Sequence, residues 1–263
     1  MEPRFEFGKN WRAFLTTITD SSILEAENGL RKLFPNQELE NSTFLDVGCG
    51  SGLSMLAAIR LGAREVQGID VDAHSIVAAE QLLAGQNARV FQKSILDASP
   101  GNIGTFDIVY SWGALHHTGA MWQALERTCN LVRPGGLLAV ALYRKTPLCP
   151  LWTFEKRVYA EAPRVLQTII RGAYKAVFLA GVLCKGKSPM GYIRDYRSAR
   201  GMSWHHDVHD WLGGYPYQSA TVEQVKLRLA NHGFKLVRIF ETPARAGGLF
   251  GSHCDEFVAQ FRP

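Results

Sequence analysis

The sequence has little cysteine and no long uninterrupted apolar run. Its five cysteines, an odd number without paired spacing, do not predict a disulfide framework and favour a reducing compartment. No run reaches the roughly 18 apolar residues that a membrane-spanning helix needs. The first residues, MEPRFEFGKNW, are charged and lack the apolar stretch of a signal peptide. We therefore expect a soluble protein of the cytoplasm.

Acidic residues are scarce in one stretch, residues 144–200. This stretch holds twelve Lys and Arg residues against three acids, Glu155, Glu161 and Asp195, while the whole chain has a net charge of +5. The local net charge of +9 indicates an anionic partner, which could be nucleic acid, a phosphorylated substrate or a membrane surface.

Strand and helix patterns alternate through the first half of the chain. Short apolar runs predict strands, and segments with helical spacing follow several of them. The predicted strands are 43–47, 65–71, 88–95, 106–112, 136–143, 234–240 and 255–261, and the predicted helices between them are 53–62, 74–85 and 121–132. Strands separated by single helices pair in parallel, so the pattern predicts a doubly wound α/β sheet.

The alternation stops between residues 144 and 220. A stretch of this length is too long for a structureless loop, and most of it has a helical composition interrupted by Pro163. We interpret the chain as four parts: an N-terminal helical segment (1–40), a core (41–143), an inserted helical cap (144–220) and a C-terminal completion of the core sheet (221–263).

A glycine-rich loop, LDVGCGSG, follows the first predicted strand. Gly48, Gly50 and Gly52 are spaced G-x-G-x-G, whereas a dinucleotide-binding loop has G-x-G-x-x-G. Asp70 ends the next strand, where a carboxylate can accept hydrogen bonds from ribose hydroxyls. Asp46 adds a negative charge that would repel a pyrophosphate and hold an ammonium group. The pattern favours S-adenosylmethionine (SAM) over NAD, and a simple turn-capping role for the aspartate is the alternative.

Five motifs in order carry a resemblance to a known family. They are LDVGCGSG, GIDVD, KSILD, FDIVYSWGALHHT and LVRPGGLLAVALY. Together they resemble the class I SAM-dependent methyltransferases, especially the bacterial small-molecule group (types 11, 12 and 25) that includes ubiquinone-biosynthesis enzymes. The resemblance implies a Rossmann-like sheet of seven strands with the last strand antiparallel.

The resemblance also implies which residues bind SAM. KSI stands where the family often has Gly-Asp-Ala, so Ser94 and the backbone of Ile95 take the adenine contact, with Asp97 as the alternative. The implied cofactor-binding residues are Asp46, Gly48, Gly50, Gly52, Asp70, Val71, Ser94, Ile95, Ser111 and Trp112.

The residues after the fourth strand bear on the chemistry. Methyltransferases that act on planar nitrogens often carry [D/N]-P-P-[Y/F] there, and this chain has SWGALHHT. His116 and His117 follow the strand at the expected mouth of the pocket. An imidazole that titrates near pH 7 can remove the proton of an acceptor hydroxyl. The alternative is that LHHT packs and caps the start of a helix.

The end of the cap, SWHHDVHDWLGGYPY, is the second concentration of polar and aromatic residues. Its DWLGGYPY element, like FGKNW near the N-terminus, resembles a group of bacterial methyltransferases. His205 and His209 have zinc-helix spacing but lack the companion ligands of a zinc site, so we expect a substrate pocket and no metal. Structural hydrogen bonding within the cap is the alternative. His206 and Asp207 are candidate catalytic residues. The expected acceptor-binding residues are Asn10, Trp11, Arg200, His205, His209, Trp211, Tyr215 and Tyr217.

These patterns predict a SAM-dependent methyltransferase that acts on a small molecule, at an oxygen, with an anionic or lipid-linked acceptor. RNA or protein methylation and a non-catalytic scaffold subunit are the alternatives. No nucleic-acid partner is expected, because the basic residues are interleaved with apolar ones as in a packed helix. The run AVFLAGVLC beside Lys175, Lys185 and Lys187 indicates a peripheral contact with the inner face of a membrane, and packing of this run onto the domain is the alternative.

Overall fold

A mixed β-sheet of seven strands forms the centre of the molecule. The computed structural model describes residues 19–200, 204–242 and 253–262. The strands are β1 (Thr43–Val47), β2 (Glu65–Asp70), β3 (Ala88–Gln92), β4 (Phe106–Trp112), β5 (Val132–Tyr143), β6 (Phe234–Phe240) and β7 (Cys254–Phe261). Their order is β3-β2-β1-β4-β5-β7-β6, and β7 runs antiparallel to both of its neighbours. The sequence expectation of a seven-stranded sheet with its last strand antiparallel is confirmed.

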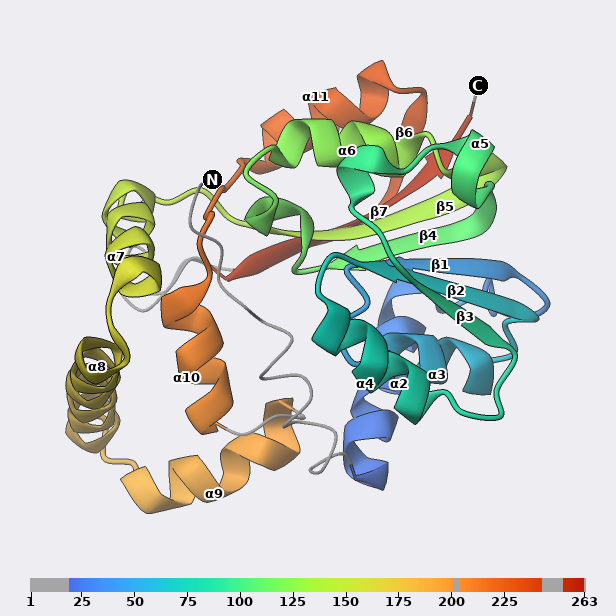
Figure 1. Ribbon diagram of the computed structural model, residues 1–263. Coiled ribbons are helices and arrows are strands. Elements are labelled where there is room, and N and C mark those ends of the chain that lie inside the picture. Colours follow the sequence, from blue (N-terminus) through green and yellow to red (C-terminus); the bar gives the residue numbers. More distant parts are fainter. Residues whose placement is uncertain (1–18, 201–203, 243–252, 263) are drawn as a thin grey trace.

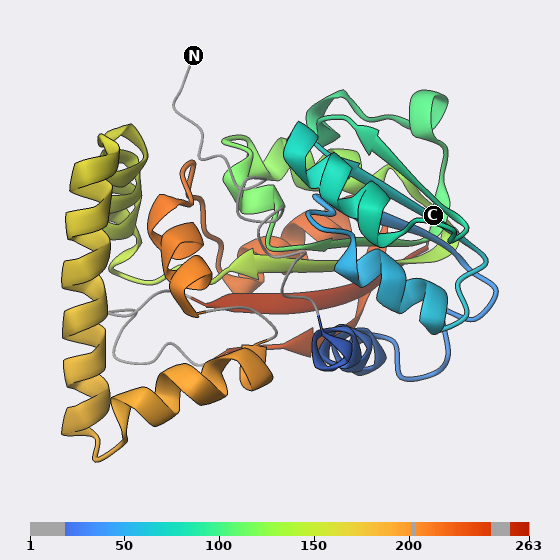
Figure 2. The same cartoon turned by 60° about the horizontal axis from the view of Figure 1, so that its bottom comes forward.

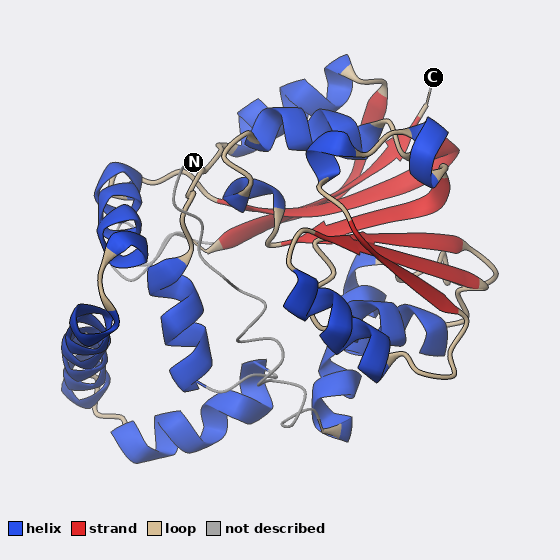
Figure 3. Ribbon diagram, in the orientation of Figure 1, coloured by secondary structure: helices blue, strands red, loops and turns tan. Residues whose placement is uncertain are grey.

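Helices cover both faces of the sheet (Figures 1 and 3). On one face lie α2 (Asp20–Leu33), α3 (Leu53–Arg60) and α4 (Ala73–Leu82), and on the other lie α5 (Pro100–Ile103), α6 (Met121–Cys129) and α11 (Val222–Asn231). Each layer has its own buried apolar cluster, one built on α2, α3 and α4 and the other on α6 and α11. All five residues of β1 are buried, as expected for a strand covered on both sides.

Local sequence signals explain several element boundaries. Thr221 and Gln224 form a capping box that starts α11, because each side chain accepts a hydrogen bond from the other residue's backbone N–H. β3 ends at Gln92, earlier than the sequence pattern predicts. The chain turns there into a 3₁₀ helix, η1 (Ile95–Asp97), which the Ser94 hydroxyl caps by accepting a hydrogen bond from the N–H of Leu96.

The stretch from residue 144 to residue 220 holds four helices: α7 (Cys149–Glu161), α8 (Arg164–Cys184), α9 (Pro189–Arg200) and α10 (Trp204–Gly213). Pro163 separates α7 from α8. The helix α10 lies on the inner side and contacts the other three, while α9 reaches back to contact α2 (Figures 1 and 2). These helices therefore form a cap that extends from the end of β5 to the opposite side of the sheet.

The long helix α8 differs from what the sequence led us to expect. By length and composition it could cross a membrane, and only 6% of its most apolar 18-residue window is buried. The sequence of α8 contains no long uninterrupted apolar run, because Arg171 and Lys175 lie among its apolar residues.

Candidate cofactor and acceptor site

A cavity of about 2330 Å³ lies between the carboxyl ends of the strands and the cap. Its walls include the last residues of four strands: Val47, Asp70, Trp112 and Tyr143. Ligands of open α/β sheets bind at this edge. A pocket for one drug-sized ligand measures roughly 300–1,000 Å³. The cavity therefore has room for two ligands.

The glycine loop between β1 and α3 forms one rim of the cavity. The backbone N–H groups of Gly48 and Cys49 both donate to the carbonyl of Ile69, at 2.8 and 3.1 Å. Gly48 has a φ of +77°, and a Cβ at this position would lie 2.3 Å from the Cβ of Ala114. Only glycine lets the loop approach the segment after β4 so closely.

Two further glycines of the loop have different positions. Gly50 lines the cavity, and its N–H donates to Asp70. Gly52 is the N-cap residue of α3, and a Cβ on it would contact Ala79 and Leu83 of α4 at 3.1 Å. Gly52 therefore allows α3 and α4 to pack closely and does not line the cavity.

Asp70 fixes the loop from the tip of β2. One carboxylate oxygen accepts from the N–H of Gly50 at 3.0 Å, and the other accepts from the N–H of Asp72 at 2.9 Å. Burial raises the pKa of Asp70, against the opposing effect of these hydrogen bonds. Each oxygen keeps acceptor capacity for a ligand. Val71, which follows it, is exposed on the cavity wall.

Asp46, near the end of β1, carries a buried carboxyl group that lines the cavity beside the glycine loop. Only 3% of the residue is exposed, and within the described part of the chain its carboxylate has no hydrogen-bond or ion-pair partner. Burial, and then the charge of Asp70, raises the pKa of Asp46 to about 8. A buried carboxylate is stabilised by a cation, so this position fits a ligand with an ammonium group.

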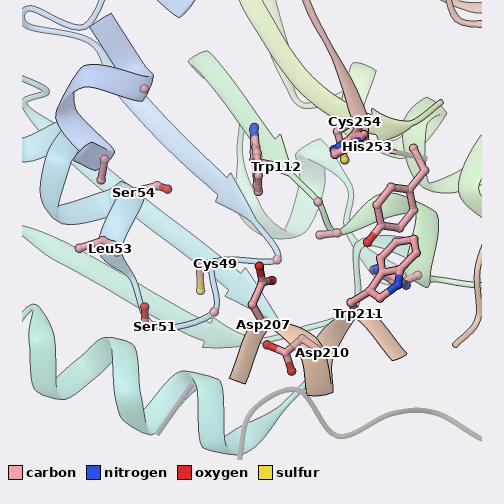
Figure 4. A pocket seen from close by; sticks show the side chains of 18 of the residues that line it. Cys49, Ser51, Leu53, Ser54, Trp112, Asp207, Asp210, Trp211, His253 and Cys254 are labelled. Carbon is pink, nitrogen blue, oxygen red and sulfur yellow. The ribbon is translucent and has the colours of Figure 1, made fainter. Parts of the chain in front are cut away.

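The ends of β3 and β4 complete the cofactor side. Ser94 and Ile95 line the cavity, and the Ser94 hydroxyl is held at the start of η1. Ser111 is fully buried, and its hydroxyl donates to the carbonyl of Val47 at 2.8 Å, which ties β4 to β1. Trp112, by contrast, projects into the cavity, and its indole N–H donates to Glu256 of β7 (Figure 4).

The two histidines after β4 are both buried. His116 stacks on Tyr143 with ring centroids 3.8 Å apart and does not line the cavity. Its Nδ1 accepts from the N–H of Tyr143 at 3.4 Å, its Nε2 has no hydrogen-bond partner, and burial holds its pKa well below the ordinary value.

His117 lies at the cavity wall and is joined to the cap. Its Nδ1 is 2.8 Å from the carbonyl oxygen of Pro216, and because a carbonyl only accepts, Nδ1 carries the proton. Burial lowers the pKa of His117 to about 4. The imidazole is therefore neutral near pH 7, and it links the core to the chain segment after α10.

One face of α10 forms the opposite wall. Asp207, Asp210 and Trp211 are spaced i, i+3 and i+4, and all three line the cavity. The two carboxylates point toward the space that faces Trp112 and Cys49 (Figure 4). Asp207 also accepts a hydrogen bond from the hydroxyl of Tyr196.

The other face of α10 packs inside the cap. His209 does not line the cavity, since its Nδ1 lies 2.7 Å from the hydroxyl of Tyr159 and 3.0 Å from the guanidinium of Arg171. Tyr217, beyond the helix, is also buried, and it packs against Tyr143. Tyr215 does line the cavity.

Comparisons with known proteins identify the core. Residues 44–136 match a family model described as a methyltransferase domain. The chain is 30% identical to the ubiquinone biosynthesis O-methyltransferase of Sinorhizobium medicae over 140 residues, which are 53% of this chain and 54% of that protein. It is 42% identical to an uncharacterised methyltransferase of Mycobacterium bovis over 101 residues, 38% of this chain and 49% of that protein.

The fold resembles that of magnesium protoporphyrin IX methyltransferase from Synechocystis, solved with bound SAH, with a TM-score of 0.54 at 15% identity over 92% of this chain and 83% of that one. Residues 44–136 therefore match a methyltransferase domain, and the fold of the chain is that of the SAM-dependent methyltransferases. The chain spans about half the length of the curated relatives it matches.

Some predicted site residues of this chain lie outside what the structure describes. Asn10 and Trp11 are outside the described residues, as are the side chains of Arg200, His205 and His206. Among the described residues no three His, Cys, Asp or Glu side chains gather as a metal site.

Sequence reasoning missed several residues of the cavity wall. Asp210 could have been found from its helical spacing to Asp207, which puts both on one face. Glu256 and Tyr143 carry no local signal, because they reach the cavity through the pairing of β5 with β7. Tyr174 and Phe178 of α8 line the wall from the cap.

Proposed function

We propose that this protein transfers a methyl group from SAM to a small-molecule acceptor, at an oxygen, held beneath the cap. The observation that carries the proposal is the buried, unpartnered carboxyl group of Asp46 beside Asp70 and the glycine loop. This combination suits a ligand that has both an ammonium group and a ribose.

The residues at the rim fit SAM. Asp46 would meet the ammonium group, Asp70 would accept hydrogen bonds from the ribose hydroxyls, and Val71 would pack against the adenine. When bound, SAM supplies a methyl group on a sulfonium that a nucleophile can displace.

The cap wall supports an acceptor that is polar and aromatic. Asp207 and Asp210 offer carboxylates that can accept the proton of a hydroxyl, and Trp211 and Tyr215 offer ring surfaces. Lys93, Lys185 and Lys187 also line the cavity and favour an acceptor that carries negative charge. The sequence SWGA at 111–114 in place of [D/N]-P-P-[Y/F], together with the name of the Sinorhizobium relative, supports oxygen as the methylated atom.

The protein's contribution to methyl transfer is alignment and removal of water. Holding acceptor and methyl donor in line makes the reaction effectively unimolecular. The cap helices α9 and α10 cover the strand ends, and His117 binds the segment after α10 to the core, so acceptor and cofactor are held in one enclosure.

Methyl-labelled SAM tests the proposal. The purified protein is incubated with labelled SAM and a host extract, and the product is divided into organic, aqueous small-molecule, nucleic-acid and protein fractions. We expect enzyme-dependent label in a small molecule that survives nuclease and protease, with the methyl group released by cleavage of a methyl ether or ester.

Nuclease- or protease-sensitive label would replace the small-molecule acceptor with RNA or protein. Label bound to nitrogen would contradict oxygen as the acceptor atom. Tight SAM binding without transfer into any fraction would favour a scaffold subunit.

A further inference from the structure

The outer face of α8 is apolar along its whole length. The exposed positions from 165 to 184 hold no charged residue; they are Val165, Leu166, Thr168, Ile169, Gly172, Ala173, Ala176, Val177, Ala180, Leu183 and Cys184. Val165, Ile169, Val177 and Leu183 are 61–74% exposed. A helix of 21 residues extends about 30 Å, so this is a long stripe and not an isolated side chain.

The charged residues inside this helix face the protein. Arg171 contacts His209 and Thr168, and Lys175 lies over the ring of Trp204, 5.6 Å from its centroid. A helix on the surface of a water-soluble domain normally shows the reverse arrangement, with its apolar stripe on the core and its charges outside.

The neighbouring helix α7 also turns two charged residues inward, while Arg157 and Glu161 form an exposed ion pair on its outer side. Glu155 and Lys156 are turned inward, and the Lys156 ammonium donates to the carbonyl of Trp211 and lies 3.5 Å from the centre of that ring. Leu151 and Phe154 are 57% and 67% exposed. Both α7 and α8 contact α10 on their inner side, and no described element lies beyond α8 (Figure 2).

Cations frame the apolar stripe. Arg164 begins α8, and Lys185 and Lys187, which also border the cavity, follow its end; all three are exposed. From 162 to 194 the chain contains no acidic residue. The surface therefore combines an apolar stripe with positively charged ends, which is the composition of helices that lie at the interface of an anionic bilayer.

We propose that the outer face of α7 and α8 docks on the surface of an anionic lipid bilayer, with α8 lying in the plane of the interface. Pairing with a second copy through this stripe is opposed by charge. Antiparallel α8 helices would bring Arg164 against Lys185 and Lys187, and parallel ones would bring each cation against itself. Docking on lipid does not depend on methyl transfer.

Vesicle flotation tests the docking. We expect the purified full-length protein to float with phosphatidylcholine vesicles that contain on the order of 30% phosphatidylglycerol, and to bind vesicles of phosphatidylcholine alone more weakly. The double variant Ile169→Glu/Val177→Glu should bind the anionic vesicles about tenfold less or worse. The matched control is Leu227→Glu, which changes an equally exposed apolar residue on α11, a helix that lies away from α7 and α8 (Figure 1). It should float like the wild type.

Thermal unfolding and SAM affinity of each variant show whether it is folded. The proposal would be overturned if the wild-type protein does not float with the anionic vesicles. It would also be overturned if the double variant is folded and the same fraction of it floats. A wild-type dimer that the double variant splits, with no flotation of either, would assign the stripe to a second copy. Protein that an alkaline wash fails to release from vesicles would mean that α8 crosses the bilayer, which also contradicts docking at the surface.

Discussion

Asp46 shows how a candidate binding residue can weaken the protein that contains it. Its pKa of about 8 lies above the ordinary value of 3.8, so the folded protein holds a proton that the unfolded chain releases. The stability associated with that proton is complete below pH 4 and is lost as the pH rises through about 8. In the absence of ligand, folding at neutral pH therefore occurs in spite of this carboxyl group.

Replacing Asp46 with Asn should remove this pH dependence. Between pH 5 and pH 7 the unfolding free energy of Asp46→Asn, relative to that of the wild type, should rise by up to about 1.4 kcal/mol per pH unit. Urea unfolding at pH 5, 6 and 7 without ligand measures the difference. Glu80→Gln, which changes an exposed carboxylate on α4, should show no such trend. A constant offset between Asp46→Asn and wild type would mean that the carboxyl group is already ionised in the folded protein.

At the scale of elements, α10 illustrates what the sequence could and could not place. The position of the cluster at 203–217 before the return to the sheet predicted a pocket wall, and of its described residues Trp204, Asp207, Trp211 and Tyr215 line the cavity. Trp204 and Val208 both line the cavity and pack with Leu212 in the buried cluster of the cap, and Asp207, Asp210 and Trp211 line the cavity beside them. The i, i+3, i+4 spacing of Asp207, Asp210 and Trp211 was the available signal that these three share one face. The inward position of His209 depends on Tyr159 and Arg171, which are distant in sequence, so spacing could not reveal it.

The link between His117 and Pro216 gives an element-scale prediction. His117→Ala leaves the Pro216 carbonyl without its donor, so we expect a loss of about 1–3 kcal/mol of unfolding free energy. Faster amide exchange between Gly213 and Tyr217 should accompany the loss. His232→Ala is the control, since its Nδ1 also contacts a carbonyl, that of Arg228, but at the exposed end of α11. Unchanged exchange in the segment after α10 would show that other contacts hold the cap.

At the scale of the whole molecule, the order of motifs along the chain was enough to predict a seven-stranded sheet with its last strand antiparallel. The contact between the glycine loop and Asp70 could also be predicted. The loop follows β1 and Asp70 ends β2, and these two strands are parallel neighbours. The apolar outer face of α8 could not be predicted from the sequence, because it depends on which side of the helix the rest of the cap covers. The net charge of +9 in residues 144–200 indicated an anionic partner, but only the fold shows where these cations lie on the molecule.

Ligand binding across the cavity should stabilise the whole fold. S-adenosylhomocysteine at about 100 times its Kd should add about 2.7 kcal/mol to the unfolding free energy, which for a chain of this size raises Tm by about 5–10 °C. Asp70→Ala removes the acceptor of the Gly50 and Asp72 N–H groups and should lose most of this shift at the same ligand concentration. Thermal unfolding with and without ligand measures both. An equal shift in Asp70→Ala would remove Asp70 from the cofactor site.

The position of β7 has a consequence for biosynthesis. Residues 254–261 are inserted between β5 and β6, both of which leave the ribosome earlier. Until β7 emerges, β5 has an unpaired edge, and the cap made immediately after β5 must form its helices beside an unfinished sheet. β7 thus closes both the sheet and the wall behind Trp112, so a nascent chain can acquire a complete cavity only after β7 has left the ribosome.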